Sequence, residues 1–349
     1  MLDNTYRKLR EGALKIVYFG ASITEGASAS DHDLTSWRAL SAGWFAKTYP
    51  ECDIKPINSS IGGTGSDFAV FRLEEDVISH SPDLVFVEFC TNDTLINDCA
   101  VYEETIIRRI RGALPLADIV MVRLMQKKMY EKSLRGEFDE SYISYERLAR
   151  RYRLPLLDLG EALCSRIRGG EGDFGTYTKD GVHPNDLGHR ILADAAISFL
   201  KANIGPGGEP RKAVPPLTGD KYMTARLVRA ASVDPGDFSV SGFSFYSDHG
   251  CLTAAAAGKK LCFEFSGPVI GIVYQIAHDT GDLLWSVDGG PETRLSTWDE
   301  YTRIFDRTAF SILSDDLAPG RHTLTVICAG EKDERSAGTD VRISDFMTV

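Results

Sequence analysis

Residues 15–26 of this 349-residue chain are KIVYFGASITEG. The apolar run at 16–19 predicts a short buried strand, because consecutive apolar residues without polar alternation suit a sheet that is covered on both faces. Gly20 interrupts the run, and Ser22 follows two residues later. A strand that ends by delivering a serine to a turn predicts an α/β fold with a candidate nucleophile at the edge of its sheet.

The first two hundred residues continue this alternation of strand and helix patterns. Apolar runs occur at 53–57, 84–89, 119–124 and 154–158, and amphipathic stretches occur at 36–49, 67–79, 102–113, 140–152 and 187–202. Strands that alternate with helices imply right-handed crossovers, a parallel sheet and a three-layer α/β sandwich. In such a sheet, the site forms at the carboxyl ends of the strands.

The pattern changes after residue 204. The segment IGPGGEP at 204–210 and the prolines at 215–216 are typical of a linker. We therefore expect a catalytic domain at 1–204, a linker at 205–220 and a second domain at 221–349. Short β-type runs then occur at 238–245, 260–265, 269–276, 283–287, 293–297 and 322–328, separated by turn signals. This pattern predicts an all-β sandwich or jelly roll.

Three further segments could complete a site around Ser22. They are NSSIGG at 58–63, CTND at 90–93 and DGVHP at 180–184. Acyl transfer needs a base, a group that orients the base, and donors for the oxyanion. His183 is the candidate base and Asp180, three residues earlier, can orient it from the same turn. Each segment also has a simpler reading: a helix cap for Ser22 or Asn92, and a plain turn for the others.

Together the four blocks resemble the SGNH (GDSL-like) hydrolase family of serine esterases, over roughly residues 14–202. The resemblance implies a flavodoxin-like sheet and hydrolysis through an acyl-enzyme. It also implies a catalytic triad of Ser22, His183 and Asp180. The Ser22 amide, the Gly63 amide and the Asn92 side chain would form the oxyanion hole.

The sequence departs from the family pattern at two positions. Ala21 replaces the aspartate of G-D-S, which in the family braces the nucleophile loop, and Cys90 replaces the glycine of G-x-N-D. Neither change removes a catalytic group. Cys90 is expected to be a small buried residue.

No cofactor or metal is expected. Asp180, His183 and His189 are the nearest approach to a metal-binding set, but the two histidines are six residues apart and would not share a helical face. The chemistry implied by the four blocks needs only protein side chains.

Charge and composition exclude several classes of partner. The net charge of −11 argues against binding to nucleic acid and to anionic membranes. No apolar run approaches the ~20 residues of a membrane span, and the first ten residues have no signal-peptide character. Seven cysteines without a C-x-x-C pair indicate reduced thiols. We expect a cytoplasmic protein, with homo-oligomerisation left open.

The substrate is predicted from two weaker signals. The segment ASASDHD at 27–33 is small and polar, which favours a short acyl group on a polar alcohol. The segments SVDGG at 286–290 and PGRHTL at 319–324 resemble parts of the jelly-roll domains of carbohydrate esterases and carbohydrate-binding modules. Trp298 and Tyr301, in a polar stretch, are candidates to stack on sugar rings.

These signals predict a carbohydrate acetylesterase that acts on acetylated oligosaccharides. One alternative is a short-chain acyl esterase or lysophospholipase whose β domain is structural. A second alternative is a sugar-binding protein with a silent esterase site.

Overall fold

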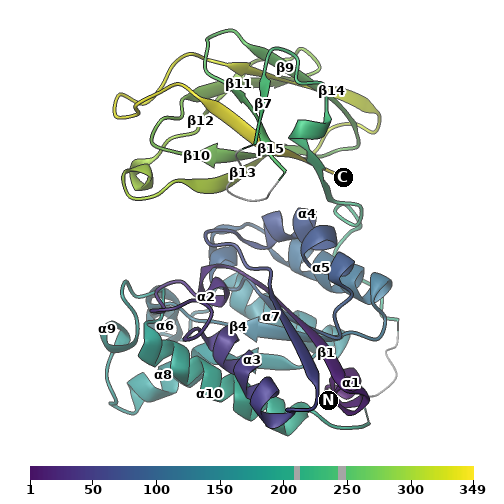
Figure 1. Ribbon diagram of the computed structural model, residues 1–349, viewed down its shortest axis with the longest axis vertical. Coiled ribbons are helices and arrows are strands. Elements are labelled where there is room, and N and C mark those ends of the chain that lie inside the picture. The colour runs from purple at the N-terminus through teal and green to yellow at the C-terminus, as the bar shows by residue number, and fades with distance from the viewer. Residues whose placement is uncertain (208–212, 243–248) are drawn as a thin grey trace. The chain divides into compact units, whose positions relative to one another are not determined.

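The fold is that of a computed structural model, which describes residues 1–207, 213–242 and 249–349. The chain forms two compact units, Met1–Tyr222 and Met223–Val349 (Figure 1). Part of the predicted linker (208–212) and part of the predicted strand at 238–245 (243–245) lie outside the described residues. Within the described part of the predicted linker, the backbone amides of Leu217 and Thr218 donate to Glu104, so this stretch is anchored on the first unit.

The first unit is built on a five-stranded parallel sheet with the strand order β2-β1-β3-β4-β5. This is the flavodoxin-like order, in which the chain reverses its direction of progress between β1 and β3. The prediction of a parallel α/β sheet is confirmed. Its strands are β1 (Ala13–Gly20), β2 (Asp53–Asn58), β3 (Leu84–Glu88), β4 (Asp118–Arg123) and β5 (Leu156–Asp158).

Two sets of helices cover the sheet, and Figure 1 shows members of each set on either side of β1. In one set α10 contacts α3 and α8, and in the other α5 contacts α4 and α7. The first set is α3 (Trp37–Thr48), α8 (Leu159–Arg168) and α10 (Asp186–Asn203); the second is α4 (Ser66–Asp76), α5 (Ala100–Ala113) and α7 (Glu140–Tyr152). The shorter elements are α1 (Asp3–Glu11), α2 (Ser22–Glu25), α6 (Lys127–Ser133), α9 (Phe174–Tyr177), η1 (Ile78–His80) and η2 (Asn92–Leu95).

The strand β1 lies between β2 and β3 and is buried from Ile16 to Gly20, as its continuous apolar sequence predicts. Tyr18 stacks on Phe86 of β3 at 4.9 Å between ring centroids, and Trp37 of α3 meets Tyr18 edge-on at 5.6 Å. These large aromatic side chains pack β1 against β3 and against α3. The end of β1, where Ser22 follows, is therefore held by the core of the unit.

The second unit contains two antiparallel sheets. One has the strand order β13-β10-β15-β8-β7, with β6 also pairing with β15, and the other has the order β12-β11-β14-β9. The strands are β6 (Arg226–Arg229), β7 (Ser239–Ser241), β8 (Cys251–Ala254), β9 (Lys260–Ser266), β10 (Ile270–Ile276), β11 (Asp282–Val287), β12 (Thr293–Ser296), β13 (Arg307–Ser314), β14 (Arg321–Cys328) and β15 (Val341–Thr348). Short 3-10 turns follow β6 (η3, Ala230–Ser232) and precede β13 (η4, Glu300–Arg303).

One hydrophobic core joins the two sheets of the second unit. Phe263 of β9 and Phe346 of β15 stack across it at 4.0 Å between ring centroids. Trp285 packs against this core, as expected from its apolar strand. A shared core between two antiparallel sheets confirms the all-β sandwich.

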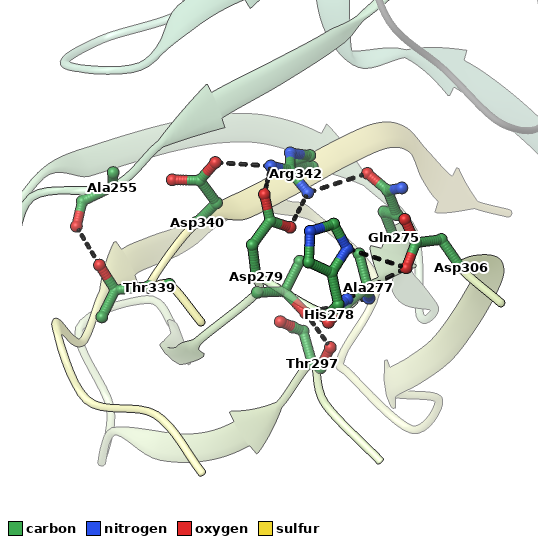
Figure 2. A network of polar contacts seen from close by, with 12 residues as sticks. Ala255, Gln275, Ala277, His278, Asp279, Thr297, Asp306, Thr339, Asp340 and Arg342 are labelled. Atoms are coloured by element: carbon green, nitrogen blue, oxygen red, sulfur yellow. Dashed lines mark hydrogen bonds and ion pairs between the residues drawn. The ribbon is translucent and has the colours of Figure 1, made fainter. Parts of the chain in front are cut away.

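A polar network in the second unit joins the loop after β10 to the start of β15 (Figure 2). Arg342 of β15 donates to both carboxylate oxygens of Asp279 at 2.7 Å, to Asp340 at 2.6 Å and to Gln275 at 3.3 Å. Asp279 follows β10 and Asp340 precedes β15, so one guanidinium fixes both loops. Bidentate pairs of this kind are more rigid than single ion pairs.

Two further features concern the whole chain. All seven cysteines are free thiols, and five of them are buried. Among the residues that the structure describes, no helix has both the length and the apolar character needed to cross a membrane.

Candidate active site

Ser22 is the first residue of α2 and lies at the carboxyl edge of the sheet. Ala21 before it is extended, and α2 ends after one turn at Gly26, whose φ is 115°. Gly20 is required at the end of β1, because a Cβ there would lie 2.8 Å from the Thr24 Cβ. The turn is thus tight enough to place Ser22 directly over the end of the strand.

His183 and Asp180 lie in the loop that precedes α10. Ser22 Oγ is 2.9 Å from His183 Nε2, and His183 Nδ1 is 2.6 Å from Asp180 Oδ2. The ionised Asp180 carboxylate can only accept, so Nδ1 carries the ring proton and Nε2 is left to accept from Ser22. The three predicted triad residues are therefore brought together in one line of hydrogen bonds.

Asp180 is held by its own turn. Its Oδ1 accepts from the backbone amides of Val182 at 2.9 Å and His183 at 2.8 Å. Partial burial acts to raise the pKa of Asp180, but these amides and the His183 ring outweigh it and lower the pKa below its usual value. The carboxylate stays ionised and oriented toward the imidazole.

The loop after β2 brings Gly62 beside the nucleophile, and Gly63 follows it in the chain. The Ile61 amide donates to the Gly20 carbonyl at 3.1 Å, and a Cβ on Gly62 would lie 3.6 Å from the Ser22 Cβ. The Gly62 amide donates to Glu25. Gly63 has a φ of 75° and its amide meets no acceptor among the described residues, so it remains available as a donor.

The loop after β3 forms η2, which begins at Asn92. No described residue accepts a hydrogen bond from the Asn92 side-chain amide, so it too is an available donor. The next residue, Asp93, is buried and accepts from the Ser66 amide at 2.7 Å. Because Ser66 begins α4, this bond ties the loop that carries Gly63 to the loop that carries Asn92.

The remaining sequence candidates lie elsewhere. His189 accepts from the Trp37 amide at 3.3 Å and contacts the Ala27 carbonyl at 3.2 Å, so both of its ring nitrogens are engaged with backbone. Burial lowers the pKa of His189 to about 4. In the second unit, Trp298 is only 7 % exposed, whereas Tyr301 is 62 % exposed. The Arg335 guanidinium lies 4.4 Å from the Trp298 ring centroid, so the ring is largely covered, and sugar stacking by Trp298 stays a prediction.

Two acidic residues support this site but were not among the site residues predicted from the sequence. Glu25 accepts from Gly62, and Glu88, at the end of β3, accepts from the Thr24 hydroxyl at 2.7 Å. A signal for Glu88 was present, because it is the one charged residue in the apolar run LVFVEF at 84–89. A charge in a strand buried on both faces indicates a specific partner.

Comparison with known proteins agrees with this geometry. Residues 18–191 match the GDSL-like Lipase/Acylhydrolase family. The chain belongs to this family through its first unit. The matched segment contains Ser22, Gly63, Asn92, Asp180 and His183, and it lies within the range where the four sequence blocks occur.

An acetylxylan esterase from Geobacillus stearothermophilus is 34 % identical over 86 residues, which cover 23 % of this chain and 39 % of that protein. The matched segment thus spans well under half the length of this curated relative. Two crystal structures of a two-domain esterase active on acetylated mannans, one of them co-crystallised with mannopentaose, have a TM-score of 0.84 and 24 % identity. They cover 98 % of this chain and 92 % of theirs, which shows that the two-domain fold is shared.

Proposed function

We propose that the protein is a serine esterase that removes O-acetyl groups from carbohydrates through an acyl-enzyme. The observation that carries the proposal is the hydrogen-bonded line Ser22–His183–Asp180 at the carboxyl edge of an acylhydrolase-family sheet. A serine, a neutral imidazole and an ionised carboxylate in this order are the parts of a triad.

In the first half of the reaction, Ser22 Oγ attacks the acetyl carbonyl carbon while its proton passes to His183 Nε2. Asp180 keeps the imidazole oriented and stabilises the imidazolium that forms. The tetrahedral intermediate then collapses, the bond to the sugar oxygen breaks, and His183 returns the proton to that oxygen. The sugar leaves with a free hydroxyl, and Ser22 carries the acetyl group.

In the second half, water attacks the acetyl-Ser22 carbonyl and gives its proton to His183 Nε2. When this second intermediate collapses, the bond to Ser22 Oγ breaks and His183 returns its proton to that oxygen. Acetic acid leaves and ionises to acetate. In both halves, the negative charge on the carbonyl oxygen would be stabilised by the Ser22 and Gly63 amides and the Asn92 side chain. Loss of one such donor typically lowers the rate about 100- to 1,000-fold.

The carbohydrate substrate is supported by the relatives and by the sequence. The relatives are described as an acetylxylan esterase and an esterase active on acetylated mannans. The small polar segment at 27–33, which follows the nucleophile turn, suits a short acyl group better than a fatty chain. A cytoplasmic location and a sugar-binding role for the second unit remain predictions.

A panel of O-acetylated manno- and xylo-oligosaccharides, followed by mass spectrometry, tests this proposal. The wild-type protein should remove acetyl groups, whereas a Ser22→Ala control should leave the panel unchanged. A parallel series of nitrophenyl esters, from acetate to octanoate, should show the fastest turnover with acetate. Turnover of nitrophenyl acetate together with an untouched panel would instead favour the short-chain esterase alternative. Rapid turnover of octanoate with an untouched panel would favour the lysophospholipase alternative.

A further inference from the structure

Glu88 is a buried acid at the point where β3 meets the nucleophile turn. It is the last residue of β3 and pairs in register with Gly20, the last residue of β1. Its side chain is 1 % exposed, in a strand whose other residues are apolar. Burial of a carboxyl group in such surroundings costs free energy unless partners compensate for the lost water.

The partners of Glu88 lie on both sides of Ser22. Its Oε2 accepts from the Thr24 hydroxyl at 2.7 Å and, in a longer contact, from the Ala21 amide at 3.5 Å. Thr24 is fully buried, and Gly20 leaves the space that it occupies. One carboxyl oxygen therefore contacts the residue before the nucleophile and the residue two positions after it.

The described residues give Glu88 no ion pair, and its Oε1 has no hydrogen-bond partner among them. Burial raises the pKa of Glu88 to about 8, against the smaller opposing effects of Thr24 and Ala21. The Arg72 guanidinium lies at the same strand end, but it donates to the Gly20 carbonyl at 3.2 Å and not to Glu88. A neutral carboxyl group at this position suits a fixed hydrogen-bond acceptor rather than a charge in the reaction.

We propose that Glu88 is a positioning residue, which sets the Ser22 hydroxyl by anchoring the nucleophile turn through Thr24. This inference rests on the proposed function, in which Ser22 is the nucleophile. Position 21 carries only a methyl group, so the side chain next to Ser22 cannot brace the turn itself. Glu88 reaches the turn from the neighbouring strand instead.

The expected effect is on turnover rather than on substrate binding. The 2.9 Å contact between Ser22 and His183 depends on where the turn places the hydroxyl. A misplacement of about 1 Å in a reacting group can cost on the order of 100-fold in rate. Loss of the anchor should therefore lower kcat while leaving the KM for a small ester nearly unchanged.

The test compares Glu88→Ala, Glu88→Gln, Thr24→Val and Thr24→Ser on nitrophenyl acetate. Glu88→Ala and Thr24→Val remove the acceptor and the donor of the same bond, and each should lower kcat about 10- to 100-fold with KM within about threefold. Glu88→Gln keeps a carbonyl oxygen and Thr24→Ser keeps a hydroxyl, so both should retain most of kcat.

Glu104→Ala is the matched control. Glu104 is a fully buried acid in the same unit that hydrogen-bonds Leu217, Thr218 and Tyr152, all away from Ser22. This variant should lower the melting temperature and leave kcat within about twofold. An equal loss of kcat in Glu104→Ala and Glu88→Ala would show a general structural role and overturn the inference.

The inference is also overturned when folded Glu88→Ala or Thr24→Val turns over within twofold of wild type. Thr24→Val, which is nearly isosteric, keeps the test decisive if Glu88→Ala fails to fold. Measuring Ser22→Ala in the same assay separates a failure of the proposed function from a failure of the positioning role. Activity in Ser22→Ala refutes the proposed function, whereas an inactive Ser22→Ala beside an unaffected Glu88→Ala refutes only the positioning role.

Discussion

Asp180 uses both of its carboxylate oxygens, one on the His183 ring and the other on two backbone amides. The second set of bonds keeps the turn in shape, and the first orients the imidazole. A substitution that preserves size can therefore disturb the base without removing it. The site depends on the charge and direction of this residue as much as on its presence.

Asp180→Asn should lower kcat by about 1,000- to 10,000-fold, because an amide no longer selects the imidazole tautomer that can accept from Ser22. Steady-state kinetics with nitrophenyl acetate measure this loss. Asp173→Asn is the control, since Asp173 caps α9 and hydrogen-bonds Thr176 rather than the triad. Near-normal turnover in Asp180→Asn would mean that Asp180 does not orient the base.

Two buried carboxyl groups join the helical turn η2 to the helix α5. Asp93 and Glu103 hydrogen-bond each other, and Glu103 also accepts from Ser144 of α7. Burial raises the pKa of Glu103 to about 7, and burial together with the Glu103 charge raises that of Asp93 well above its usual value. The pair is therefore expected to share a proton near neutral pH.

This pair predicts how stability depends on pH. A carboxyl whose pKa is raised in the folded state stabilises the fold fully below its unfolded pKa, and this stabilisation is lost as the pH rises through the folded value. For Glu103 this pH window runs from the usual glutamate pKa of 4.5 to about 7. Melting temperatures of Glu103→Gln should therefore fall less than those of wild type between pH 5 and about 8.

The amide of Glu103→Gln mimics the protonated acid, because it can donate to Asp93 and accept from Ser144. Glu161→Gln, which changes an exposed acid on α8, should keep the pH dependence of wild type. Parallel curves for wild type and Glu103→Gln would show that the pair does not hold an extra proton.

Strands with an uninterrupted apolar sequence could be predicted from the sequence alone. The strands β1, β3 and β4 of the first unit were predicted to within three residues at each end, because continuous apolar runs are typical of strands covered on both faces. The edge strand β2 was also predicted, although Asp53, Lys55 and Pro56 interrupt its apolar pattern. β15 was missed although it lies in the middle of its sheet, since Arg342 and Asp345 interrupt its apolar pattern. Asp345 pairs with Arg229 and Arg342 pairs with Asp279, and both partners lie far from β15 in the sequence.

The same distinction applies to the candidate site. Ser22, His183 and Asp180 could be proposed because their motifs follow strand ends or share a turn. The charge in its apolar run marks Glu88, but its partner Thr24 could not be predicted, because that contact depends on β3 lying beside β1. The contact of Asp93 with Ser66 likewise depends on how α4 packs. Burial of Trp298 under Arg335 was hidden for a similar reason, since residues 298 and 335 meet only in the folded unit.

The whole chain combines an acylhydrolase-family unit with a β-sandwich unit. Tyr301 of the second unit is exposed and remains a candidate for sugar stacking, whereas Trp298 is covered. We predict that a sugar-binding role of Tyr301 would affect large substrates and not small esters. Such contacts can contribute to the reaction of large substrates without affecting small ones.

Tyr301→Ala should lower kcat/KM on acetylated oligosaccharides about fivefold, the equivalent of about 1 kcal/mol of stacking. Turnover of nitrophenyl acetate should be unchanged. Ile304→Ala removes a neighbouring exposed apolar side chain that has no ring, and it should leave both substrates unaffected. Equal rates for Tyr301→Ala and wild type on every oligosaccharide would assign the second unit another role.

The proposed function requires Ser22 to be the nucleophile and His183 to be the base that activates it. The most direct measurement is inactivation with a fluorophosphonate, followed by peptide mass mapping of the covalent adduct. If Ser22 is the nucleophile, one equivalent of the fluorophosphonate should abolish esterase activity and the adduct should be on Ser22. His183→Ala should react with the reagent far more slowly. Complete inactivation with the adduct on a different residue, or full esterase activity in a protein fully labelled at Ser22, would contradict this assignment.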